Sequence, residues 1–186
     1  STGWLDSGSD CVRSHLAKVD IDLWCNDWTT LKPVARDDIA PFVVASVDIE
    51  CNSSTGKFPD ADIPGDACLQ KAVSLCTFGK DEPYEKVSLC YKKTEGPGVV
   101  SFDTEREMLL AFKDYLHDKD IDIITGWNIF GFDLEYIYKR AAMTGCGMGF
   151  YQMGKLHDTE SHLLHKKLSS SALGDNFLKL LPMPGR

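Results

Sequence analysis

Apolar residues in the first two thirds of the chain follow a strand-like pattern. Four short runs are rich in β-branched residues, which is typical of buried or half-buried strands. These runs lie at residues 42–51, 72–78, 86–91 and 121–125. A turn-rich segment at 79–83 separates the second run from the third, so we expect an antiparallel hairpin or meander there. We expect the loop at 94–99, which contains Gly and Pro, to end that layer of the sheet.

The period of the pattern changes after residue 103. Thr104 and Glu107 have the spacing of a capping box, in which the Thr hydroxyl caps a helix and the Glu side chain reaches back. Apolar residues then recur at helical spacing, and the charged residues 117–120 close this helix. We expect a second amphipathic helix over 134–142 and a short helix within 156–168. Strands followed by helix, strand and helix predict an α/β fold in which helices pack on a mixed sheet.

Two acidic residues interrupt the first predicted strand. Asp48 and Glu50 occupy alternate positions of Val47-Asp48-Ile49-Glu50, so their side chains face the same way. Neighbouring carboxylates repel each other, and a cation bound between them would remove that cost. Mg²⁺ or Mn²⁺ suits such an all-oxygen site better than zinc does. The alternative is a strand that runs into solvent and carries two exposed acids.

A second group of candidate residues follows the last predicted strand. Asp133 stands where a helix begins after a strand, and ligand sites form at such junctions in α/β folds. The alternative for Asp133 is an ordinary N-cap, and Asn128 could be an ordinary turn residue. Phe58 lies near the middle of the turn-rich loop 52–66. It could stack on a nucleobase or fold back on the core.

Composition narrows the classes of function. The 186 residues carry a formal net charge of −8, which argues against a stand-alone module that grips duplex DNA by its phosphates. An enzyme whose own metal ions meet the phosphates remains compatible with this charge. No apolar run reaches membrane-spanning length. The seven cysteines include no CxxC pair, which argues against a disulfide framework or a Cys-based zinc site. We interpret several of them as small buried residues in a reducing compartment.

The two ends of the chain predict a piece of a longer protein. The sequence does not begin with Met and ends without a recognisable C-terminal cap. We interpret residues 1–40 as the tail of an upstream β-rich domain and 41–186 as the main domain. The spacing of His157, His162 and His165 does not suit a helical zinc pair, and we expect them on a solvated face.

The two acidic motifs together resemble the first two exonuclease motifs of the family B DNA polymerases. The delta-like group of eukaryotes and large DNA viruses is the most similar, and the resemblance runs from about residue 38 to the end. It is weakest over 145–180. The matching stretches are Ile39-Ala40-Pro41, Ser46 to Cys51, Gly56-Lys57-Phe58-Pro59, Thr125 to Asn128 and Gly131-Phe132-Asp133.

This resemblance implies an incomplete 3′–5′ exonuclease domain of ribonuclease H-like fold, truncated at its C-terminal end. Such a domain removes 3′-terminal nucleotides from DNA with two divalent metal ions, Mg²⁺ or Mn²⁺. Carried over to this chain, Asp48 would contact both ions, Glu50 would hold the first ion and orient the attacking water, and Asp133 would serve the second. The resemblance also implies that Asn128 contacts the substrate strand and that Phe58 packs against the terminal base.

The third motif of the family, YxxxD, is missing. None of the six tyrosines is followed by Asp four positions later, so we expect this fragment alone to be catalytically incompetent. The resemblance further implies a replicative polymerase in the nucleus or at a viral replication site. Its partners would be a single-stranded 3′ end or primer–template DNA, the polymerase domain of the same chain, and a sliding clamp with accessory subunits, but no membrane. The alternatives are a stand-alone exonuclease and a non-catalytic nucleic-acid-binding or scaffold domain of the same fold.

Overall fold

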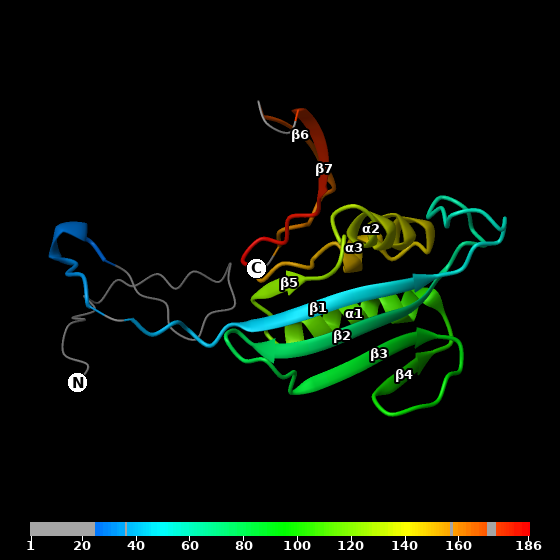
Figure 1. The fold of residues 1–186 in the computed structure, drawn as a ribbon, viewed down its shortest axis with the longest axis horizontal. Helices are drawn as coiled ribbons and strands as arrows, with labels where there is room; N and C mark the ends of the chain where they lie inside the picture. The colour runs from blue at the N-terminus through cyan, green and yellow to red at the C-terminus, as the bar shows by residue number, and fades with distance from the viewer. Residues whose placement is uncertain (1–24, 36, 157, 171–173) are drawn as a thin grey trace.

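A five-stranded mixed sheet forms the centre of the computed structural model, which describes residues 25–35, 37–156, 158–170 and 174–186 (Figure 1). Its strands follow the order β4-β3-β2-β1-β5. They are β1 (Val43–Cys51), β2 (Cys68–Thr77), β3 (Glu85–Tyr91), β4 (Val99–Phe102) and β5 (Ile123–Thr125). The helices are α1 (Glu105–Asp118), α2 (Asp133–Met143) and α3 (Gly147–Phe150). A separate hairpin joins β6 (Leu164–Ser170) and β7 (Gly174–Leu180).

The central strand β1 has two different neighbours. Along its whole length β1 pairs antiparallel with β2, which in turn pairs antiparallel with β3. On its other side, β1 pairs in parallel with the three residues of β5, and this pairing ends at Ser46. The outer edge of β1 beyond Ser46 is therefore not covered by β5.

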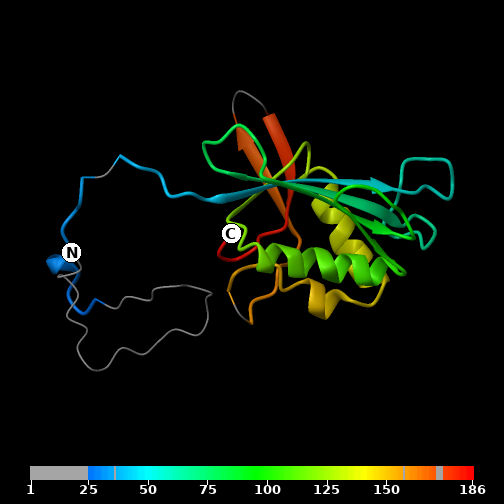
Figure 2. The same cartoon turned by 90° about the horizontal axis from the view of Figure 1, so that it is seen from below.

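The core lies between the sheet and the helices, and α1 lies across one face of the sheet (Figure 2). Side chains of β1 alternate: Ala45, Val47 and Ile49 are buried, and the residues between them are exposed. The buried face of α1 packs against the same cluster. Its apolar members are Met108, Leu109, Phe112 and Leu116. The face of the sheet that carries the acidic residues of β1 is thus the open one.

The predicted capping box at the start of α1 is confirmed. The Thr104 hydroxyl accepts a hydrogen bond from the Glu107 N–H at 3.1 Å. In return, the Glu107 carboxylate accepts one from the Thr104 N–H at 3.0 Å. Two N–H groups that a helix start leaves unpaired are satisfied in this way, and α1 begins where the sequence predicts.

Three predictions about single elements are wrong. First, β2 begins at Cys68, four residues earlier than predicted, because the buried Lys71 interrupts its apolar pattern. Second, the loop at 94–99 does not end the layer, because β4 follows it and pairs in parallel with β3. Third, residues 164–170 form β6 instead of a helix. Their backbone groups pair with β7, which comes later in the chain.

The N-terminal segment leads into β1 from one side of the molecule (Figure 1). Its described part, at 25–35 and 37–40, is exposed and contains one short 3₁₀-helix, Trp28–Thr30. Residues 1–24 of the predicted upstream β-rich tail lie outside the described residues. The predicted domain boundary at residue 40 therefore stays a prediction. No helix in the described ranges is long and apolar enough to span a membrane.

Candidate functional site

The free edge of β1 is the place where the candidate residues meet. Asp48 lies on the open face of β1, two residues after the end of its pairing with β5. The chain after β5 nevertheless stays close to β1 because of Gly126. A Cβ at Gly126 would lie 2.2 Å from the Val47 carbonyl oxygen and 2.4 Å from the Ile129 side chain. Only glycine allows this approach, which directs the following loop along the β1 edge.

Asn128 shapes the turn that leads into α2. Its φ of 55° lies in the left-handed region, which asparagine tolerates better than most residues. The Asn128 carbonyl accepts hydrogen bonds from the N–H groups of Gly131 at 2.8 Å and Phe132 at 3.2 Å. Its exposed side chain lies over Gly131, where an added Cβ would come within 2.2 Å of the Asn128 Oδ1 atom. The structure thus gives Asn128 a turn-forming role, and a substrate contact stays a prediction.

Asp133 is the first residue of α2, and its side chain is only 4% exposed. The N-cap position belongs to Phe132, which forms no side-chain capping bond, so the alternative interpretation of Asp133 as the N-cap is wrong. The Oδ1 atom of Asp133 is buried and has no hydrogen-bond partner among the residues that the structure describes. A buried carboxylate oxygen without a partner is costly for a folded protein. Its position is therefore better explained by a ligand than by stability.

The surroundings of Asp133 place it beside Asp48. Burial raises the pKa of Asp133 above the ordinary carboxyl value, and the negative charge of Asp48 acts in the same direction. The nearby N–H groups of Asp133 itself and of Ile49 on β1 oppose this rise. Since Ile49 follows Asp48 directly, the Asp133 carboxylate lies against the free edge of β1. The structure brings these two predicted site residues together.

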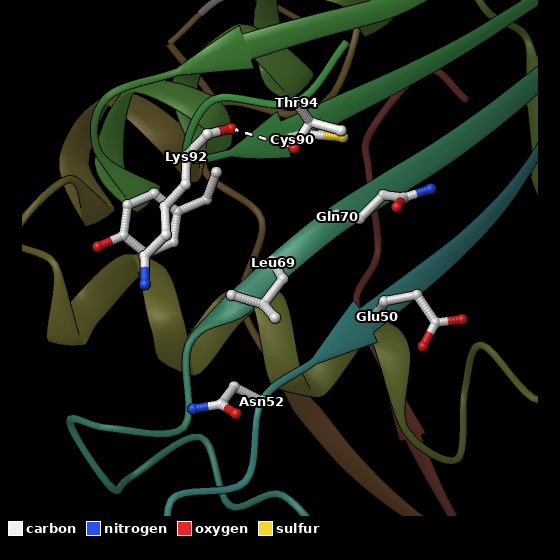
Figure 3. A pocket seen from close by; sticks show the side chains of 8 residues that line it. Glu50, Asn52, Leu69, Gln70, Cys90, Lys92 and Thr94 are labelled. Carbon is white, nitrogen blue, oxygen red and sulfur yellow. Dashed lines mark hydrogen bonds between the residues drawn. The ribbon is translucent and has the colours of Figure 1, made fainter. Parts of the chain in front are cut away.

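Glu50 lies further along the open face. It lines one end of a shallow groove of about 430 Å³ that crosses β1, β2 and β3 (Figure 3). Gln70 stands opposite Glu50 on β2, and Lys92 lines the groove beyond the end of β3. Within the described ranges, no three His, Cys, Asp or Glu side chains are arranged to hold one metal ion. Glu50 therefore neighbours the Asp48–Asp133 pair without completing a cluster with it.

Phe58 is 75% exposed at the same end of the molecule. Its ring contacts the Phe132 ring edge-to-face, with the ring centroids 5.1 Å apart. Phe132 in turn packs against Tyr136, at 4.9 Å between centroids, and is half-buried against the core. Because Phe132 directly precedes Asp133, this aromatic row holds the exposed Phe58 ring near the acidic pair. The alternative that Phe58 folds into the core is wrong.

The loop that carries Phe58 is held by a buried aspartate that the sequence pattern did not reveal. The Asp66 carboxylate accepts hydrogen bonds from the Ser54 N–H at 2.6 Å, the Ser54 hydroxyl at 2.5 Å and the Asp60 N–H at 3.0 Å. These bonds, that of the Ser54 hydroxyl first, lower the pKa of Asp66. The Tyr136 hydroxyl donates to the Asp66 carbonyl at 2.6 Å. One residue thus closes both ends of the loop onto α2.

A buried ion pair between α1 and α2 also holds this loop, through hydrogen bonds to its backbone carbonyls. Arg140 on α2 is 2% exposed, and its Nη2 atom lies 2.6 Å from a carboxylate oxygen of Glu105 on α1. The guanidinium also donates to the Ala61 carbonyl at 3.2 Å and the Ile63 carbonyl at 2.9 Å. Glu105 accepts a further bond from the Cys68 N–H at 2.9 Å. Charged residues in helices usually lie on a solvent-exposed face, so the sequence pattern does not predict this buried pair.

Lys71 is a second buried charge near the site. It is fully buried on β2 opposite Ile49, and its Nζ atom has no hydrogen-bond partner in the described part of the chain. The ammonium lies 4.9 Å from the centroid of the Phe112 ring. Burial lowers the pKa of Lys71, and the nearby charges of Glu105 and Asp133 partly oppose this. A strand pattern alone does not predict a lysine inside the core.

The three histidines that we expect on a solvated face lie outside the sequence motifs that contain Asp48 and Asp133. His162 and His165 are exposed, and His165 belongs to β6. His157 lies outside the described residues. Of the described cysteines, Cys68, Cys90 and Cys146 are buried free thiols, in agreement with the predicted role of small buried residues.

Comparison with known proteins matches the amino-acid sequence to a protein family. Residues 2–177 match the family model described as DNA polymerase family B, exonuclease domain. This chain belongs to that family. The mixed five-stranded sheet with flanking helices agrees with the ribonuclease H-like exonuclease fold expected from the sequence. The two acidic motifs that carried the resemblance, at residues 46–51 and 131–133, both lie inside the matched range.

Relatives of this exonuclease domain are DNA polymerases of viruses and eukaryotes. The DNA polymerase of Paramecium bursaria Chlorella virus NY2A is 33% identical over 183 residues, which cover 94% of this chain and 20% of the viral protein. The DNA polymerase delta catalytic subunit of Arabidopsis thaliana is 37% identical over 151 residues, 80% of this chain and 14% of the plant protein. That of Schizosaccharomyces pombe is 29% identical over 180 residues, 94% of this chain and 16% of the yeast protein. The chain spans a fifth or less of each.

Proposed function

We propose that this chain is the proofreading part of a replicative DNA polymerase and that it hydrolyses 3′-terminal nucleotides of DNA. Membership in the family B exonuclease domain supports the reaction class. The names of the relatives support a polymerase as the parent protein. Its substrate would be a single-stranded 3′ end presented by primer–template DNA.

The observation that carries this proposal is the buried, unpartnered Oδ1 atom of Asp133 beside Asp48. The buried carboxylate of Asp133 and the exposed one of Asp48 repel each other, and the Asp133 Oδ1 atom has no hydrogen-bond donor among the described residues. A hard divalent cation fits both features, because it accepts carboxylate oxygens and cancels their charge. Asp48 and Asp133 fit this role, and Glu50 adds a third carboxylate from the same strand.

We infer that two Mg²⁺ or Mn²⁺ ions belong to the intact site, held by Asp48, Glu50 and Asp133. These ions would supply charge stabilisation to the attacking and leaving oxygens of a phosphodiester. Glu50, exposed on the open face, would orient the attacking water from the groove side. Exposed Phe58 would stack on the terminal base, a contact worth about 1–3 kcal/mol per base. Asn128 would contact the substrate strand from the turn before α2.

The test uses the polymerase that carries this chain and a primer with a mismatched 3′ end. Asp48→Ala is expected to lower the rate of nucleotide release by roughly a hundredfold or more, since it removes a ligand shared by both proposed ions. Nucleotide incorporation by the same variant should stay within about twofold of the parent rate, which separates loss of chemistry from loss of folding.

Asp81→Ala is the matched control, because Asp81 is exposed in the turn between β2 and β3. Both of its activities should equal those of the unchanged protein. Full exonuclease activity in Asp48→Ala would refute the proposed site. The activity would then come from another part of the polymerase, which would favour the alternative in which this fold binds nucleic acid without catalysis.

We further propose that the missing YxxxD motif, the polymerase domain and the binding partners belong to the parent protein. A sliding clamp and accessory subunits would join it in the nucleus or at a viral replication site. The eukaryotic and viral relatives support this location. Without the third motif, the 186-residue chain should release nucleotides far more slowly than the polymerase that contains it.

A further inference from the structure

Two cysteines face each other across the sheet next to Glu50. Cys51 on β1 and Cys68 on β2 are register partners at a point where the register shifts. Glu50 pairs with Gln70 and Cys51 with Cys68, so Leu69 is an extra residue in β2. Figure 3 shows Leu69 beside the Glu50–Gln70 pair. An extra residue of this kind is a β-bulge, and bulges let a strand bend and adjust locally.

The hydrogen bonds around the bulge identify the type of this cross-strand pair. The Asn52 N–H donates to the Ala67 carbonyl at 2.9 Å, across the two strands. The Cys68 N–H points away from β1 and donates to Glu105 at 2.9 Å. Antiparallel pairs alternate between the two types, so Cys51 and Cys68 form a non-hydrogen-bonded pair, with a typical Cα separation of about 4.5 Å. Disulfides span Cα separations of about 4.4–6.8 Å.

The two cysteine side chains lie opposite each other on adjacent strands and differ in their exposure. Cys51 is half-buried and within reach of a small solute, whereas Cys68 is fully buried. The register partners of Cys76 and Cys90 are Val44 and Gln70. Within the paired strands of the described sheet, only the Cys51–Cys68 pair joins two thiols in this way.

We propose that Cys51 and Cys68 are a redox modification site, which hydrogen peroxide converts to a disulfide and thiols restore. In the first step the Cys51 sulfur attacks one peroxide oxygen, giving a sulfenic acid and one water. In the second step the Cys68 sulfur attacks the Cys51 sulfur and expels its oxygen, which leaves as a second water with the remaining thiol proton. Two thiols lose two electrons in total, and one peroxide is reduced to two waters.

The bond would act on the neighbouring acid. Cross-strand Cβ atoms are usually about 4.5–5.5 Å apart, and a disulfide requires about 3.5–4.5 Å. Closing it draws the ends of β1 and β2 together by roughly 1 Å, directly beside Glu50. A displacement of about 1 Å in a catalytic group can cost up to a hundredfold in rate. This consequence rests on the proposed function, whereas formation of the bond does not.

The bond itself is tested by peptide mapping of the whole polymerase after peroxide treatment and alkylation. Trypsin cleaves after Arg36, Lys57 and Lys71, which places Cys51 alone in peptide 37–57 and Cys68 alone in peptide 58–71. We expect one cross-linked species whose mass is the sum of both peptides less two hydrogens. Dithiothreitol before alkylation should return two separately alkylated peptides.

The effect is tested by measuring release of mismatched 3′ nucleotides from the same samples. Peroxide should lower this rate roughly tenfold to a hundredfold, and dithiothreitol should restore it. Cys51→Ala and Cys68→Ala should each keep the rate under peroxide. The matched control Cys76→Ala also lacks a cysteine of β2 and should stay as sensitive as the unchanged protein.

Three outcomes would overturn the inference. They are failure to detect the cross-linked species, equal inhibition of the Cys51→Ala variant, and an unchanged rate in fully cross-linked protein. A protein without exonuclease activity before oxidation would instead contradict the proposed function. Even in that case, the cross-linked peptide still decides whether the disulfide forms.

Discussion

Asp133 is the residue at which stability and function oppose each other most clearly. Its Oδ1 atom is buried without a partner, and burial raises the pKa of the carboxyl group. Groups that destabilise a fold and yet lie at a proposed site are expected where activity depends on them. A substitution of Asp133 therefore tests directly whether this carboxylate serves structure or ligand binding.

Asp133→Asn should stabilise the metal-free protein and remove its response to metal. The amide carries no charge into the buried position, so we expect Tm in EDTA to rise by roughly 2–4 °C. Added Mg²⁺ should raise Tm of the unchanged protein, because a ligand that binds only the folded state stabilises it. The variant should show no such increase. A large fall of Tm in EDTA would instead give Asp133 a structural role.

Lys71 makes a second prediction at this scale, which concerns pH. Its ammonium is fully buried without a hydrogen-bond partner, so Lys71→Met should increase the free energy of unfolding by about 1–3 kcal/mol near pH 7. The folded-state pKa is lowered by burial, and the unfolded chain binds the proton up to about pH 10.4. The unchanged protein should therefore gain stability as pH rises between these two values.

The gain in free energy of unfolding from Lys71→Met is therefore largest at pH values below the folded-state pKa of Lys71. It shrinks as the pH rises toward about 10.4. Urea unfolding at a series of pH values measures this difference. Lys86→Met is the matched control on β3, because Lys86 is exposed. A constant advantage of Lys71→Met across the whole pH range would show that burial does not lower the pKa of Lys71.

At the scale of single elements, the loop between β1 and β2 depends on Asp66. This carboxylate holds Ser54 and Asp60 by three hydrogen bonds. Asp66→Ala should speed amide hydrogen exchange over residues 52–66 by roughly tenfold or more, because the loop can then open locally without breaking these three hydrogen bonds. Asp62→Ala in the same loop removes only an exposed ion pair with Lys139 and should change exchange little. Equal protection in both variants would contradict the anchoring role.

The helices α1 and α2 depend on the buried Arg140–Glu105 pair. Arg140→Met leaves the Glu105 carboxylate buried without its partner, so we expect a loss of about 3–5 kcal/mol in the free energy of unfolding. The double variant Arg140→Met with Glu105→Gln should lose less than the sum of the single changes, by roughly 0.5–3 kcal/mol. Urea unfolding of all four proteins measures this coupling, and strict additivity would show that the two side chains act independently.

Most elements were predictable because their own residues specify them. The β1 strand, the capping box at Thr104 and the α2 helix each carry a local pattern of spacing or burial. β4 and β6 were not predicted, because both are defined by pairing with a distant strand. Propensity alone does not show which strand will cover an edge.

The same distinction explains the site. Asp48, Glu50 and Asp133 stand in short motifs, so the sequence alone indicated them. Asp66 and Arg140 have no such motif, since their roles arise only when the loop folds back on α2. The contact between Asp133 and the Ile49 N–H group depends on the early end of β5. Backbone pairing of this kind leaves no trace in composition or periodicity.

At the scale of the whole molecule, the site combines three segments that are far apart in the chain. β1, the loop after it and the start of α2 meet at one end of the sheet, on a molecule with a net charge of −8. Such a molecule attracts DNA weakly through its own surface. Binding of a 3′ end should therefore depend on cations held by the acidic residues.

Binding of the 186-residue chain to single-stranded DNA should accordingly require a divalent ion. We expect EDTA to weaken the affinity at least roughly tenfold. The slope of log affinity against log salt concentration should be shallow, because each phosphate neutralised by a basic residue adds only about −0.7 to it. Fluorescence anisotropy with a labelled oligonucleotide measures both. Asp48→Ala should bind as weakly with Mg²⁺ as the unchanged chain does in EDTA. Tight binding in EDTA with a steep salt slope would instead reveal a basic surface as the DNA contact, and metal-dependent recognition would then be wrong.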